Sequence, residues 1–175
     1  MATKYRTAVI GRHQAEGIFH AVRFAHDKGR PLNLLVTINL SMLGFADEAA
    51  GDQFRNIWNS VVRWWSYQRS KGRELGSFDA YAVHENPNDI RNVHWLIYAP
   101  ANAISELIKV VEKRVCKMAG LDSADRALHF LPVTKAGGLT KYALKGVDPN
   151  YAGYFHMVAR DQGTVADEEF QSAAV

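Results

Sequence analysis

The chain has 175 residues, which is enough for one domain with a substantial hydrophobic core. Its net charge of +3 permits nucleic-acid binding without requiring it, and its 47% hydrophobic content is ordinary for a globular protein. No apolar run approaches the roughly 20 residues of a membrane helix, and Met1 to Ile10 lacks the apolar block of a signal peptide, so we expect a cytoplasmic protein. The single cysteine, Cys116, excludes an internal disulfide and any zinc site built from several cysteines.

The first 40 residues predict a helix followed by a strand. Apolar residues recur at helical spacing over residues 14–28, and Gly29 to Pro31 end that segment. Residues 32–40, LNLLVTINL, are rich in branched side chains, and polar ones recur at even spacing, as in a half-buried strand. On this strand Thr37 or Asn39 faces substrate, or else water or a neighbouring strand.

Two longer helices are predicted over residues 47–69 and 101–118, each with one apolar face, and Gly120 supplies the second stop. We interpret Trp64 and Trp65 as core residues rather than as a surface that stacks bases, because large aromatics at helical spacing usually bury their surface. Clustered cations in this region either contact phosphate or form a solvated helix face: Arg63, Arg69, Lys71 and Arg73, and then Lys109, Lys113, Arg114 and Lys117.

The segment between these helices predicts a β-hairpin. Two short apolar runs, residues 78–83 and 93–99, flank a polar stretch that contains Pro87. A fourth strand follows at residues 127–133, at the edge of the sheet because Pro132 lacks a backbone donor. The order β, α, β, β, α, β predicts an α+β fold, namely a ferredoxin-like or RRM-like antiparallel sheet with extra N- and C-terminal helices.

One face of the hairpin gathers groups that could hold a divalent metal. Because side chains alternate along a strand, Asn92 and His94 point to one face, while Val93 points to the other. Across the loop, either His84 or Glu85 reaches the same face. We prefer Glu85, because a hard cation favours a carboxylate.

A second group of residues with possible chemistry is predicted on a short helix over residues 139–146. Tyr142 and Lys145 are three positions apart, so their Cβ atoms lie about 5–6 Å from each other on one helix face. Tyrosine, with a pKa of about 10, is a poor nucleophile at neutral pH and needs help. A neighbouring ammonium ion favours the phenolate or neutralises charge that builds on a phosphate, and a metal polarises the phosphoryl oxygens.

Taken in order, these residues resemble the HUH superfamily of single-stranded DNA nicking enzymes, the replication initiators and relaxases of plasmids, phages and small DNA viruses. Glu85 closes one strand, His94 lies on the next, and Tyr142 lies on a helix after the fourth strand. The resemblance spans residues 30–155. It departs from the family's pattern of histidine, hydrophobic residue and histidine at Asn92, which replaces the first histidine and binds a metal only through a neutral carbonyl oxygen.

The resemblance implies a function and a role for each residue. Tyr142 would attack a DNA phosphodiester and stay attached through a phosphotyrosine bond, with Lys145 beside it. His94, Glu85 and Asn92 would hold Mg²⁺ or Mn²⁺. The partner would be single-stranded DNA at an origin or hairpin, and the outcome would be site-specific nicking and joining that initiates rolling-circle replication or mobilisation.

Alternatives remain open at this point. One is a catalytically degenerate module of the same fold that only binds single-stranded nucleic acid, with Asn92 marking the loss of metal. Another is a ferredoxin-like domain engaged in protein contacts. We expect residues 1–160 to form the nuclease domain and residues 161–175 a loosely held tail, and we interpret Tyr151 and Tyr154 as packing or DNA contacts.

Overall fold

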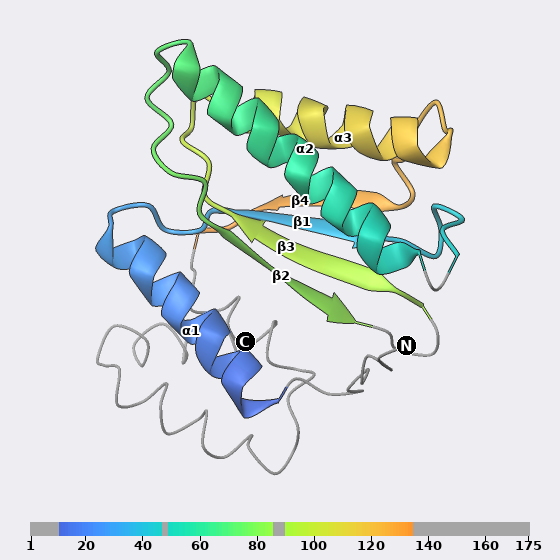
Figure 1. The fold of residues 1–175 in the computed structure, drawn as a ribbon, viewed down its shortest axis with the longest axis horizontal. Helices are drawn as coiled ribbons and strands as arrows, with labels where there is room; N and C mark the ends of the chain where they lie inside the picture. Colours follow the sequence, from blue (N-terminus) through green and yellow to red (C-terminus); the bar gives the residue numbers. More distant parts are fainter. Residues whose placement is uncertain (1–10, 47–48, 86–89, 135–175) are drawn as a thin grey trace, which may run out of the picture. The chain divides into compact units, whose positions relative to one another are not determined.

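The computed structural model describes residues 11–46, 49–85 and 90–134 (Figure 1). The chain divides into two compact units, one made of Met1–His20 with Gly137–Val175 and the other of Ala21–Ala136. The second unit contains every described strand. Several predicted features lie outside the described residues: the helix over 139–146 with Tyr142 and Lys145, the pair Tyr151 and Tyr154, the loop over 86–89, and the tail from residue 161.

The described elements follow the predicted order. They are α1 (Arg12–Asp27), β1 (Leu34–Asn39), α2 (Ala50–Ser70), β2 (Ala80–Glu85), β3 (Asn92–Ile97), α3 (Ile104–Ala119) and β4 (Leu128–Pro132). None of these helices is long and apolar enough to cross a membrane. The predicted stop of α3 is confirmed, because Gly120 adopts the left-handed conformation with φ of 67° and its N–H bonds to the carbonyl of Cys116.

The bounds of β2 differ slightly from those of the apolar run that predicted it. The strand begins two residues later than the apolar pattern indicated and continues through His84 and Glu85. The sequence predicts that Glu85 closes this strand, and in the structure Glu85 pairs with Asn92 and His84 with Val93 of β3. The predicted strand end at Glu85 is therefore confirmed.

The strands form a four-stranded open sheet in the order β2-β3-β1-β4, and all neighbours are antiparallel. β4 lies at one edge, as Pro132 predicted. Because cross-strand partners share a face, the register fixes which side chains meet: Thr37 of β1 lies between His94 of β3 and His129 of β4. The fold is α+β, with this sheet and several helices.

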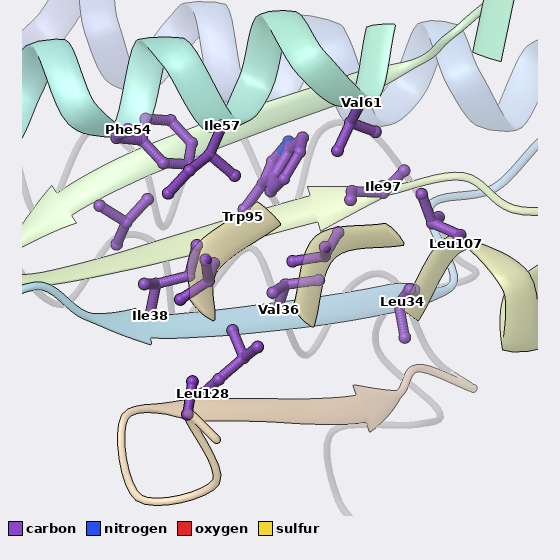
Figure 2. Close-up of a cluster of buried hydrophobic side chains, with 14 of the residues drawn as sticks. Leu34, Val36, Ile38, Phe54, Ile57, Val61, Trp95, Ile97, Leu107 and Leu128 are labelled. Atoms are coloured by element: carbon purple, nitrogen blue, oxygen red, sulfur yellow. The ribbon is translucent and has the colours of Figure 1, made fainter. Parts of the chain in front are cut away.

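Two helices, α2 and α3, cover one face of the sheet (Figure 1). Between them and the sheet lies a core centred on Trp95, which is fully buried and points from β3 toward α2 (Figure 2). Its ring stacks on Trp58 at 5.1 Å and meets Phe54 edge to face at 5.5 Å. Trp65 is also buried in this core, which confirms its interpretation as a core residue, and Trp64 is partly buried and packs against the core.

Candidate functional site

The polar side chains of the predicted site lie on the sheet face opposite to α2 and α3. The register places Asn92 directly opposite Glu85 on β2, and His94 directly opposite Thr37 on β1. Trp95, which follows His94, belongs to the core under the helices. The predicted separation of Asn92 and His94 from the core face of β3 is therefore confirmed.

The choice between His84 and Glu85 is decided by the alternation along β2. His84 lies on the helix side, where its ring meets Phe54 edge to face at 5.2 Å. Although one side of His84 is exposed, desolvation by this packing lowers the pKa of its imidazole below the usual value. Glu85 lies on the other face, as predicted, and its side chain is 13% exposed.

His94 sits between two side chains from neighbouring strands. It is only 3% exposed, its Nε2 lies 3.1 Å from Oε2 of Glu85, and its Nδ1 lies 3.1 Å from Oγ1 of Thr37. An ionised carboxylate can only accept hydrogen bonds, so a neutral ring paired with one would donate from Nε2 to Glu85 and accept the Thr37 hydroxyl proton at Nδ1. Contacts from two neighbouring strands thus fix the position and orientation of the imidazole.

Of the predicted donor set, the structure brings His94 and Glu85 into contact, whereas Asn92 is placed only by the register. Asn92 is half-buried. The strand register places it opposite Glu85 of β2 on one side and opposite Asn39 of β1 on the other. Asn39 is engaged locally, because its Oδ1 accepts a hydrogen bond of 2.9 Å from the N–H of Met42. Beside the carboxylate of Glu85, the amide of Asn92 is therefore the side chain of this row that could supply an oxygen ligand.

The geometry of His94 and Glu85 is that of a hydrogen bond. Their facing atoms, Nε2 and Oε2, are 3.1 Å apart, so a cation bound by both would have to take the place of the proton between them. One carboxylate, one amide oxygen and one imidazole form a mixed set that suits Mn²⁺ at least as well as Mg²⁺. Within the described segments, no group of three or more His, Cys, Asp or Glu side chains could hold a metal ion.

Two further residues of this face are Thr37, which the sequence predicts to face substrate, water or a neighbouring strand, and Tyr81, for which it predicts no role. The contact of Thr37 with His94 joins positions 57 residues apart, and only the register reveals it. Tyr81, on the same face and opposite Leu96, is buried, and its hydroxyl has no hydrogen-bond partner among the residues that the structure describes. Burial raises the pKa of this phenol well above its usual value. Tyr81 is therefore a neutral phenol at physiological pH.

In comparisons with known proteins, no family model, no curated protein and no solved structure matches this chain.

Proposed function

We propose that this protein is a metal-dependent enzyme of the HUH type, which nicks and rejoins single-stranded DNA through a covalent phosphotyrosine intermediate. The observation that carries the proposal is the contact between His94 and Glu85, because it brings an imidazole and a carboxylate from adjoining strands to within 3.1 Å. Such a preorganised pair, supported behind by Thr37, is what a divalent cation site requires.

The arrangement of the elements supports the fold that this proposal needs. The order β1-α2-β2-β3-α3-β4, the strand order β2-β3-β1-β4 and the antiparallel pairing of all neighbours agree with a ferredoxin-like βαββαβ core. We infer that α1 and the predicted helix over residues 139–146 are additions to this core. The face without α2 and α3 would then carry the reaction.

Each residue has a defined role in the proposed reaction. Glu85, His94 and Asn92 hold the cation, whose bound charge would polarise the phosphoryl oxygens of the substrate. The phenol of Tyr142 gives up its proton as its oxygen forms a bond to phosphorus, the bond from phosphorus to the departing sugar oxygen breaks, and that oxygen takes up a proton. Attack by a sugar hydroxyl on the phosphotyrosine reverses these changes and rejoins a strand. Lys145 neutralises charge at the phenol and phosphate.

The covalent intermediate is the direct test. The protein is incubated with Mn²⁺ and a library of end-labelled single-stranded oligonucleotides, and denaturing gels are inspected for a labelled protein band. We expect an adduct that Tyr142→Phe abolishes and that the matched control Tyr151→Phe retains. The proposal fails if no adduct forms across the library, or if Tyr142→Phe still forms one.

A degenerate module that only binds single-stranded nucleic acid is the second candidate, and one observation favours it. Both ring nitrogens of His94 already contact protein atoms, so a cation must displace the proton between His94 and Glu85. Calorimetric titration with Mn²⁺ separates the two candidates. Binding that is lost in both His94→Ala and Glu85→Gln supports the enzyme, whereas absence of binding in the unmodified protein supports the module.

A further inference from the structure

The exposed side of α3 carries a row of lysines. Lys109, Lys113 and Lys117 follow one another at intervals of four, so they share one helix face, and all three are exposed. None of them forms an ion pair within the described part of the chain. Like charges at this spacing destabilise a helix. The stability of α3 therefore does not account for this row.

The two acidic residues of α3 lie at helical spacing from the lysine row, Glu106 three positions before Lys109 and Glu112 three positions after it. Glu106 forms an ion pair with Arg73, which follows α2. Glu112 lines a separate pocket together with Cys116 and Asp122. In the described part of the chain neither glutamate forms an ion pair with a lysine of the row, so this side of α3 keeps a net positive charge.

A neighbouring strip of α2 extends this field and adds an aromatic ring. Arg114 of α3 donates a hydrogen bond to the hydroxyl of Ser60, which identifies the side of α2 that lies beside α3; Figure 1 shows the two helices next to each other on the sheet. Arg63 and Tyr67 are three and seven positions after Ser60, so they lie on the same side. Both are exposed, and the Tyr67 ring is 57% exposed with the ammonium of Lys71 at 5.4 Å from its centroid.

We propose that this helix-layer surface, formed by Arg63, Tyr67, Lys109, Lys113 and Lys117, binds single-stranded nucleic acid. The lysine row rises by about 6 Å per step, so its three ammonium groups suit a linear chain of phosphates better than a single anion. The exposed ring of Tyr67 offers a platform for one base, and stacking on aromatic rings beside cations is the general mode of single-strand binding. The surface lies on the opposite side of the sheet from His94, and the proposal does not depend on the nicking reaction.

A membrane is a poorer partner for this surface. A helix that lies on a lipid surface inserts an apolar face beside its cations. The apolar face of α3, which includes Leu107, Val111 and Val115, is fully buried against the core. What remains outside is charged and carries one tyrosine, so we commit to a nucleic acid.

The test measures the affinity of the full chain for fluorescein-labelled oligothymidylate by anisotropy over a series of KCl concentrations. On single strands, each phosphate contact contributes about 0.7 to the slope of log affinity against log salt. K109Q/K113Q/K117Q should therefore weaken binding and reduce the slope by about 2. Tyr67→Leu should weaken binding about tenfold, whereas Tyr67→Phe should keep it.

The matched control removes the same charge elsewhere. Lys28, Arg55 and Arg126 are exposed positions outside the helix-layer surface, and K28Q/R55Q/R126Q should retain the salt slope. Equal losses in the two triple variants, or no loss in the lysine variant, would overturn the proposal. It would also be overturned if the lysine variant lost binding to phosphatidylserine vesicles but not to the oligonucleotide. A failed adduct assay leaves this measurement unaffected, so the two proposals fail separately.

Discussion

The hydrogen bonds of the buried imidazole of His94 depend on the correct pairing of three strands. Its ring is held from β2 by Glu85 and from β1 by Thr37, so two flanking strands must both be in register to satisfy it. A buried group that loses one such partner costs about 1–3 kcal/mol. The same contacts that would orient a metal ligand therefore also contribute to the stability of the sheet.

Replacing the hydroxyl of Thr37 measures that contribution. Thr37→Val keeps the shape but leaves Nδ1 of His94 without its donor, so we expect the free energy of unfolding to fall by about 1–2 kcal/mol. Thr37→Ser restores the hydroxyl and should recover most of the loss. The measurement is urea unfolding at neutral pH, and equal stability of the Val and Ser variants would contradict the assigned hydrogen bond.

Substitutions at two glycines of the helices can distinguish the effect of backbone conformation from that of packing. An added Cβ meets nothing within 4 Å at either Gly51, in the first turn of α2, or Gly120, at the end of α3. Only Gly120 has a positive φ, of 67°. A Cβ therefore has room at both positions. The backbone angle φ alone should decide whether a substitution by alanine raises or lowers the free energy of unfolding.

We expect Gly51→Ala to stabilise the protein by about 0.5–1 kcal/mol, because alanine is the better helix former. Gly120→Ala should destabilise it by about 1 kcal/mol, because an L side chain is strained in the left-handed region. Thermal unfolding of the two variants beside the parent protein measures both changes. Effects of the same sign would contradict the helix end at Gly120.

The same elements show what the sequence could and could not predict. The alternation of Asn92 and His94 with Val93 was predictable because a strand has a period of two, whatever its neighbours. The contact of His94 with Thr37 was not, because it depends on the register between two strands separated by a helix and a hairpin. For Tyr142, position on a predicted helix says nothing of its distance from His94, so its role remains a proposal.

The stability of the whole molecule should carry a pH dependence that originates at His84. Packing against Phe54 lowers the pKa of this imidazole in the folded protein below the value of about 6.5 for an unfolded chain. The unfolded state therefore binds the proton more readily. The contribution of the neutral His84 to the free energy of unfolding is fully present above about pH 6.5. It is lost as the pH falls from there through the pKa that His84 has in the folded protein.

His84→Phe keeps an aromatic edge beside Phe54 but cannot take up a proton, so its unfolding should depend less on pH than that of the parent protein. The measurement compares urea midpoints of both proteins at neutral pH and at mildly acidic pH, where the other histidines contribute to both alike. We expect the parent to lose more stability on acidification than the variant. If the two proteins lose the same amount of stability, His84 is not the group that takes up the proton on unfolding. Its packing against Phe54 would then not lower the pKa of the imidazole in the folded protein.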